Sequence, residues 1–438
     1  MMDVAIGFIL VGMLVALIVA GTPIGVALIF LSLTGTWMVR GNLAVAVSMV
    51  GSGAFSSIAE NLFSVIPLFV LMGMLVSVSG VGQDTFGVAQ WLLRRVRGGL
   101  GIATVDANTL FAAVTGISVA SASVFAQVAV PPMLHFGYTP RFAVGVVAGS
   151  SILGMLIPPS ILMIVYGVLA EVSIGRMFLA GVIPGLIMAG AFVLLIVLLA
   201  RFKPAYVFSS PGAVAVNEKA ETTAGMLAKM VPIVLLIVTV LGGLYGGVFT
   251  ATECGAMGAL GAFLIAGARR RLNLPTLWSV LVETGYVSVG ILFLLMAASM
   301  YSRMLTMAGI PAAIGSLIEE FGVGRYGFLA VYVLCVVLMG MILDSVSILL
   351  IVTPIAVPIA KSFGMDLVQF GVISVVAVET GLLTPPFGLS VFAVKSALGD
   401  ASIRLETIFA GALPYVAVML AVLGLLTAFP ALSIWLAY

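Results

Sequence analysis

The chain has 438 residues, of which 63% are hydrophobic and 8% charged, and its mean hydropathy is +1.32. This composition excludes a soluble globular domain and predicts an all-α polytopic membrane protein. The net charge is +2, with one short basic run at residues 269–271, so nucleic acid is not an expected ligand.

The first half begins with three apolar segments of about the length of a membrane span, at residues 4–20, 23–39 and 62–80. The first lacks the basic region and cleavage site of a signal peptide, so we expect it to be a retained span. Residues 41–61 are of mixed polarity and are expected to lie along the membrane interface. Residues 81–99 predict an amphipathic interfacial arm.

The next apolar run, at about 100–135, is interrupted by a cluster of small and hydroxyl residues, TGISVASAS, at 115–123. This pattern predicts a re-entrant helical hairpin, whose turn is protected inside the protein. Residues 142–170 then predict a span that is broken by a glycine and a Pro-Pro pair, because proline lacks the N–H that a helix requires. A span at 178–200 completes a first repeat, residues 1–200, and 201–229 form a polar cytoplasmic linker.

The second half, residues 230–438, repeats this plan. Its spans are expected at 231–244, 255–268 and 282–299, followed by an arm near 311–320. A second hairpin is expected at about 328–360, with MGMILDSVS at its centre. The remaining elements are a broken helix at 368–398, containing ETGLLTPPFGL, and a last span at 408–426.

The two halves align at a constant offset. Pro385 follows Pro158 by 227 residues, and the same offset pairs Ser118 with Ser345 and Gly154 with Gly381. Shared proline, glycine and serine positions cannot be explained by hydrophobicity alone, so they indicate an internal repeat.

Five crossings separate the two hairpins, so the hairpins are expected to enter from opposite faces and the repeats to be inverted. If the first hairpin opens to the cytoplasm, most of the 18 basic residues lie inside, which the positive-inside rule favours. Both termini are then periplasmic. The basic residues left outside are Arg40, Arg176, Arg303, Arg325 and Lys361.

Broken helices expose carbonyl oxygens that suit a hard monovalent cation such as Na+, and half-helix N-termini suit a carboxylate. Two related Na+ sites are therefore expected where each hairpin tip meets a broken helix. Their ligands would be Thr115, Ser118, Ser121, Gly154, Ile157 and Pro158 in the first repeat, and Gly340, Ser345, Gly381, Thr384 and Pro385 in the second. Substrate contacts are expected from Ser123, Pro159, Asp344, Ser347 and Pro386.

Three charged residues are of particular interest. Asp344 lies at a hairpin tip at membrane depth, where an acid is expected to be functional. Glu379, just before the second break, either orients the broken helix or binds an ion. Arg303, near the outer end of a span, either extends to the interface or meets an anionic substrate.

Residues 149–185, GSSILGMLIPPSILMIVYGVLAEVSIGRMFLAGVIPG, resemble the signature of the large membrane subunit of tripartite ATP-independent periplasmic (TRAP) transporters. GMILDSVSILLIVTPIAVPI and ETGLLTPPFGLSVF resemble its second-repeat counterpart. The resemblance implies an elevator-type secondary transporter, with a scaffold and a mobile transport domain, driven by Na+ in the inner membrane of a bacterium or archaeon.

The same resemblance implies partners and a substrate class. An organic acid, often a carboxylate, would be delivered by a periplasmic solute-binding protein, and a small four-helix membrane subunit would be a separate chain. No cofactor is expected besides Na+ as the coupling ion.

No enzyme is expected, because the sequence contains no GxxxxGK[ST] phosphate loop, no HExxH and no GxSxG motif. Two alternatives to the TRAP interpretation stay open. One is a stand-alone Na+/carboxylate symporter of the same superfamily, and the other is a channel or structural membrane subunit.

Overall fold

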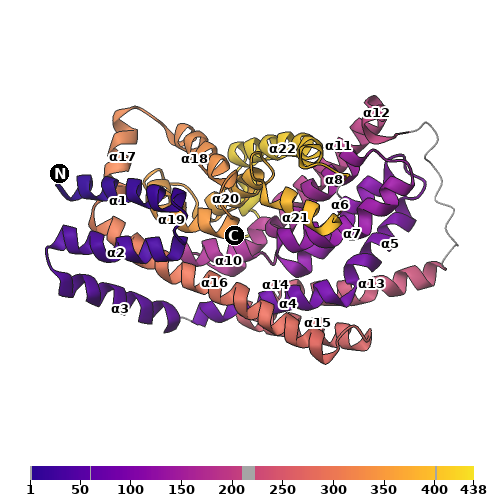
Figure 1. Cartoon of the computed structure of the whole chain (residues 1–438), viewed down its shortest axis with the longest axis horizontal. Helices are drawn as coiled ribbons and strands as arrows, with labels where there is room; N and C mark the ends of the chain where they lie inside the picture. Colours follow the sequence, from indigo (N-terminus) through magenta and orange to yellow (C-terminus); the bar gives the residue numbers. More distant parts are fainter. Residues whose placement is uncertain (1, 60, 210–221, 400–401) are drawn as a thin grey trace.

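The computed structural model describes residues 2–59, 61–209, 222–399 and 402–438 (Figure 1). Within these ranges the chain is helical, apart from connecting segments and an isolated bridge between Tyr138 and Phe208. The expected all-α fold class is therefore confirmed. The middle of the expected linker, residues 210–221, lies outside the described residues.

The elements of the first half are α1 Met2–Val19, α2 Ile24–Arg40, α3 Leu43–Ala59, η1 Asn61–Ser64, α4 Val65–Ser79, α5 Val81–Leu93, α6 Gly99–Thr115, α7 Ser118–His135, α8 Pro140–Ser151, α9 Leu153–Leu156, α10 Ile161–Leu169, α11 Ile174–Phe202 and α12 Pro204–Val207. Those of the second half are α13 Thr223–Ile237, the π-helical η2 Val238–Gly242, α14 Gly243–Tyr245, α15 Ala251–Ala268, α16 Leu274–Met307, α17 Ile310–Glu320, α18 Arg325–Gly340, α19 Ser345–Ser362, α20 Leu367–Leu382, α21 Leu389–Leu398, α22 Leu405–Ala428 and α23 Ala431–Ile434.

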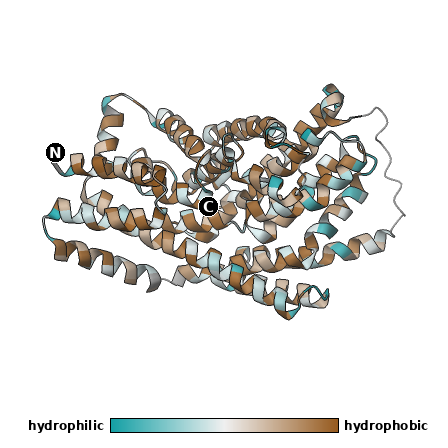
Figure 2. Ribbon diagram, viewed as in Figure 1, coloured by the Kyte–Doolittle hydropathy of each residue, from teal (hydrophilic) through white to brown (hydrophobic). Residues whose placement is uncertain are grey.

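Several helices have the length and apolarity of membrane spans. Six qualify among the described residues, and up to eight do if two bent pairs are each taken as one span. The bent pairs are α4 with α5, at 61°, and α8–α9 with α10, at 42°. Figure 2 shows hydrophobic residues, in brown, along the outer helices, and large apolar side chains such as Leu194 and Leu198 of α11 are exposed. Such a surface is suited to lipid.

The 227-residue offset is visible in the helix boundaries. α7 and α19 begin at the paired residues Ser118 and Ser345, and both have 18 residues. α8 and α20 begin at the paired positions Pro140 and Leu367, each directly after a capping residue, Thr139 or Asp366. Because such caps satisfy the first backbone N–H groups, they set where each broken helix starts. The repeat thus extends from residue types to secondary structure.

Residues 41–61, which were expected along the membrane interface, contain helix α3, which packs against α2 and α16. In Figure 1, α3 and α4 follow one another along α16, and α16 contacts both of them. Since the offset pairs residues 47–79 with residues 274–306 of α16, the two shorter helices correspond to one long helix of the second half. The buried side of α3 carries small residues such as Gly53 and Ser57, which accounts for the mixed polarity, and its place relative to the interface stays a prediction.

The broken helices form the interior of the molecule. In α8 every residue from Phe142 to Ser151 is buried, and in α20 every residue from Val368 to Leu382 is buried. A helix that is buried on all sides belongs to a core. The first break, residues 151–160, is therefore held inside the protein, where freed backbone groups are protected from lipid, and the second follows directly on the buried helix α20.

Candidate functional site

The first hairpin tip packs directly onto the first broken helix. The turn between α6 and α7 is Gly116 and Ile117, and Gly116 has a φ of +65°. A Cβ atom on Gly116 would lie 2.5 Å from the carbonyl oxygen of Pro159, so no side chain fits between tip and break. Ile161 N also donates to Gly116 O at 3.3 Å. The tip turn and the Pro158–Pro159 segment, whose peptide bond is cis, thus form one backbone contact.

Other members of the first expected site contribute to the same contact. Gly154 faces Ile117, because its Cβ would lie 3.1 Å from the Ile117 carbonyl carbon. Ile157 packs against α11, where a Cβ on Gly185 would meet its side chain at 2.6 Å. Ser160 caps α10 by accepting from Met163 N at 3.3 Å. Residues 151–160 are all buried, so this break has no opening to the surface.

The second tip meets the second break in the same way. A Cβ on Gly381 would lie 2.6 Å from Gly340 Cα, so the two backbones touch. Phe387 N donates to Met341 O at 3.3 Å, and the Pro385–Pro386 bond is cis. Thr384 Oγ1 donates to Thr380 O at 2.8 Å, within its own helix turn. Residues 384–387 are partly or fully exposed, in contrast to the first break.

The hydroxyl groups of the first tip have different partners. Thr115 Oγ1 donates to Phe111 O at 2.9 Å, within its own helix turn, and the Thr115 carbonyl oxygen faces Gly73 of α4. Ser121 Oγ donates to Asn108 Oδ1 at 2.5 Å, and Asn108 Nδ2 donates to Ser150 Oγ at 2.6 Å. All three residues of this chain are buried. It links α6, α7 and α8 just behind the tip.

Asn108 and Ser150 were missed in the sequence analysis, which considered only the tips and the breaks. An amide within an apolar run was the available signal for Asn108. The chain of three has no counterpart in the second repeat, because the offset pairs Asn108 with Cys335, Ser121 with Ile348 and Ser150 with Ala377. The two expected sites are therefore related in backbone and different in side-chain chemistry.

Glu379 of α20 lies between the two repeats. Its side chain is 1% exposed, and Ser345 Oγ donates to its Oε1 at 3.3 Å. The hydroxyl of Ser118, the repeat partner of Ser345, lies near this carboxylate as well. Within the described residues, however, Glu379 Oε2 and Ser118 Oγ have no partner at hydrogen-bond geometry. Of the two roles considered for Glu379, its position beside both tip serines favours contact with an ion.

The expected substrate residues do not gather at one place. Asp344 caps α19 by accepting from Ser347 N at 3.0 Å, and the Ser347 hydroxyl donates to the same carboxylate. Pro159 and Pro386 are in the two breaks. Ser123 is not brought to the site: its hydroxyl donates to Val119 O at 2.9 Å. Ser123 follows Ser121 by two residues on α7, a rotation of about 200° around the helix axis, so it lies away from the buried face that Ser121 occupies.

The chain is similar to known transport proteins over nearly its whole length. A family model described as "Tripartite ATP-independent periplasmic transporter, DctM component" matches residues 11–432. The "C4-dicarboxylate TRAP transporter large permease protein DctM" of Pseudomonas aeruginosa is 33% identical over 400 residues, covering 89% of this chain and 91% of that protein. The "Sialic acid TRAP transporter large permease protein SiaM" of Vibrio cholerae is 29% identical, covering 96% of each.

Two further relatives extend this comparison. The "Isethionate TRAP transporter permease protein DctMQ" of Oleidesulfovibrio alaskensis is 30% identical and covers 98% of this chain, which spans 66% of that protein. A solved structure, the Alcanivorax borkumensis YdaH transporter, aligns with a TM-score of 0.61 at 14% identity, covering 86% of this chain and 88% of that one. This likeness concerns the fold alone. The relatives named here are permeases and transporters, which agrees with the expectation that the chain is not an enzyme.

Proposed function

Because this chain belongs to the DctM component family of tripartite ATP-independent periplasmic transporters, we propose that it couples the entry of Na+ to the uptake of a small organic acid. Membership in the family makes it a multi-pass permease subunit of a secondary transport system. We propose the coupling ion, the moving parts and the substrate.

The observation that carries the Na+ proposal is the environment of Glu379. Its buried carboxylate has one oxygen without a partner in the described chain, next to a tip serine, Ser118, that is likewise unpaired. A buried charge of this kind is costly unless a counter-charge or a proton compensates it. Na+ would supply that charge and would accept hydroxyl, carbonyl and carboxylate oxygens together.

We assign the proposed Na+ ligands by repeat. In the first, Ser118 and the carbonyls near Gly154, Ile157 and Pro158 would act, with Thr115 and Ser121 beside them, the latter held by Asn108. In the second, Ser345, Gly340, Gly381, Thr384 and Pro385 would act, with Glu379 added to both. The substrate would contact the partly exposed second break, near Pro386 and Asp344, with Pro159 and Ser347 behind it.

The proposed motion is that of an elevator. The tips and breaks touch through backbone, so they would move as one body. The first hairpin lies against the backbone of the neighbouring helix α4, since a Cβ on Gly73 of α4 would lie 2.6 Å from Thr115 O. A surface formed by glycine offers few side chains that interlock, which supports sliding between α4 and the first hairpin.

The proposed partners follow from the family and its relatives. The family is described as tripartite, and the isethionate permease extends well beyond the part that matches this chain. We propose a small membrane subunit and a periplasmic binding protein as the other two components. The relatives are named for C4-dicarboxylates, sialic acid and isethionate, which supports an acidic organic substrate.

The test is uptake into liposomes that contain this chain, with and without a small membrane subunit and a periplasmic binding protein of a tripartite transporter. Succinate, isethionate and sialic acid serve as probes under an imposed Na+ gradient. We expect accumulation above equilibrium only with all components and inward Na+. Accumulation by this chain alone would indicate a stand-alone symporter, and equilibration without accumulation would indicate a channel or a structural subunit.

A further inference from the structure

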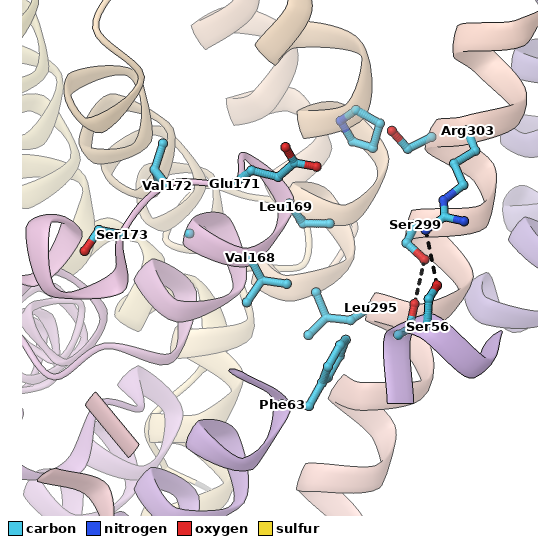
Figure 3. Close-up of a pocket in the computed structure, with 14 residues that line it drawn as sticks. Ser56, Phe63, Val168, Leu169, Glu171, Val172, Ser173, Leu295, Ser299 and Arg303 are labelled. Carbon is cyan, nitrogen blue, oxygen red and sulfur yellow. Dashed lines mark hydrogen bonds between the residues drawn. The ribbon is translucent and has the colours of Figure 1, made fainter. Parts of the chain in front are cut away.

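A cavity of about 520 Å³ lies apart from the hairpin tips, between α3, the α10–α11 turn, α16 and α19 (Figure 3). Its volume is in the range of sites that hold small ligands. Along α19, Pro354 at its wall is nine residues beyond Ser345, or about 14 Å in a helix. No residue expected at the ion sites lines this cavity.

One positive side chain lies among hydroxyl groups at the cavity wall. Arg303 of α16 donates through Nη2 to Ser56 Oγ at 3.2 Å, and Figure 3 shows its guanidinium directed toward Ser56 and Ser299. Ser57 and Ser299 share a hydrogen bond at 3.0 Å beside it. Within the described residues Arg303 has no carboxylate partner, and the one side-chain hydrogen bond it makes there is to Ser56. A guanidinium flanked by hydroxyls is suited to a carboxylate or a sulfonate.

The opposite wall carries Glu171, in the turn between α10 and α11. Its φ is +55°, a left-handed conformation that glycine adopts at less cost. Val172 N donates to Gly167 O at 2.9 Å and closes this turn. A glutamate maintained in a strained position at a cavity wall is consistent with a role for its side chain. Its carboxylate could accept a hydrogen bond from a hydroxyl or ammonium group.

We propose that this cavity is a second binding site for a small organic anion, whose acidic group meets Arg303 and whose hydroxyl or ammonium end meets Glu171. The inference rests on the proposed transport of an organic acid and adds a station where the acid is held before or after it occupies the hairpin site. In the orientation that the sequence predicts, this station lies in the outer half of the protein, where a delivered substrate would arrive.

The test uses charged thiol reagents and requires neither uptake nor Na+. The native cysteines are replaced (Cys254→Ala, Cys335→Ala) in the full-length chain in lipid nanodiscs, and Ser302→Cys places a thiol on the cavity wall. Two methanethiosulfonates are compared: the anionic 2-sulfonatoethyl reagent, itself a small organic sulfonate, and the cationic 2-(trimethylammonium)ethyl reagent. The measured quantity is the ratio of their labelling rates.

We expect Arg303→Gln to lower this anion-to-cation ratio by about tenfold, because a positive wall concentrates anions. Arg303→Lys keeps the positive charge and should preserve most of the ratio. This variant therefore distinguishes an effect of the charge from an effect of misfolding. Glu171→Gln should change the ratio in the opposite direction. Arg40→Gln, an equal loss of charge at the end of α2, is the matched control and should leave it unchanged.

The proposal is overturned if Ser302→Cys does not react with either reagent, since the cavity would then be closed to ligands. It is also overturned if Arg303→Gln and Arg40→Gln have equal effects. If Glu171→Gln leaves the labelling ratio unchanged, the claim that Glu171 contributes to the binding site is wrong. Any of these results leaves the proposed Na+-coupled transport intact, because uptake and its Na+ dependence are measured separately.

Discussion

Glu379 and Asn108 are buried polar residues whose environments differ in one respect. Asn108 is satisfied by two serines, whereas Glu379 has one paired and one unpaired oxygen within the described chain. A satisfied buried amide stiffens the packing around it, and a carboxylate with a free oxygen can receive a ligand. We therefore assign Asn108 to positioning and Glu379 to ion binding.

Glu379→Gln tests the ion-binding assignment. The amide has the same shape without the charge, so we expect the Na+ concentration for half-maximal uptake to rise at least tenfold, about 1.4 kcal/mol of binding free energy. Ser118→Ala combined with Ser345→Ala should change it in the same direction. Glu283→Gln, on the exposed side of α16, is the control. Equal Na+ dependence in all variants would refute the assignment.

Asn108→Ala tests the positioning role. Ser121 would lose its buried acceptor, so we expect a loss of about 1–3 kcal/mol in the free energy of unfolding. The equivalent residue of the second repeat, Cys335, is exposed, and Cys335→Ala should cost much less. Thermal unfolding of the purified chain measures both. A similar small effect for the two variants would show that the chain from Ser121 to Ser150 contributes little.

At the scale of elements, each hairpin is joined to its broken helix by backbone contact. In the second repeat this contact is between Gly340 of α18 and Gly381 of α20, where a Cβ on either residue would overlap the other backbone. Backbone atoms cannot move aside as a flexible side chain can. The second hairpin tip and its break can therefore stay in contact only while both positions are glycine, and a larger residue would force them apart.

Gly381→Ala should accordingly force the second hairpin away from its break. Overpacking of this kind typically costs about 1–3 kcal/mol, so we expect a folded protein whose uptake is reduced by at least tenfold. Gly290→Ala on α16 is the matched control, because no atom lies within 4 Å of its added Cβ. Normal uptake by the Gly381 variant would mean that the tip can separate from the break without loss of function.

At the scale of the whole molecule, the structure contains two copies of one plan, with matching helix boundaries and different access to their breaks. The first break is buried throughout, whereas residues 384–387 of the second are partly exposed. A carrier needs its site to open to one side at a time, and repeats that differ in exposure meet this need. The inverted orientation of the repeats is a prediction of the sequence that the fold does not contradict.

Labelling with a membrane-impermeant thiol reagent tests this orientation. In a background without native cysteines, Ser209→Cys reports on the opening of the first hairpin, because Ser209 N donates to Gly137 O at 2.8 Å. Ser362→Cys reports on the end of α19. We expect only the second to react from outside intact cells and both to react after permeabilisation. Reaction of both from the same side would exclude inverted repeats.

The hairpins and broken helices were predictable because their causes are local in sequence. Proline removes a backbone N–H that a helix uses, and the helices end before Pro158 and Pro385 at matching positions, whereas other prolines, such as Pro184 and Pro354, lie inside continuous helices. The residues near these breaks were located by the same reasoning, and their role as ion ligands stays a prediction. Asn108, Ser150 and the central place of Glu379 were not, since Asn108 and Ser150 are 42 residues apart in the chain. Their contact depends on how α6 and α8 rotate against each other.

By itself, the sequence determined the membrane class, the repeat and the two helix breaks, because hydrophobicity and backbone chemistry act over short stretches of chain. The tertiary structure alone decided that α3 and α4 match one long helix, that Ser123 faces away, and that Glu379 meets both tip serines. It also decided that Arg303 and Glu171 share a cavity. These features arise from distances between helices that are remote in sequence, and such distances are set only when the whole protein packs.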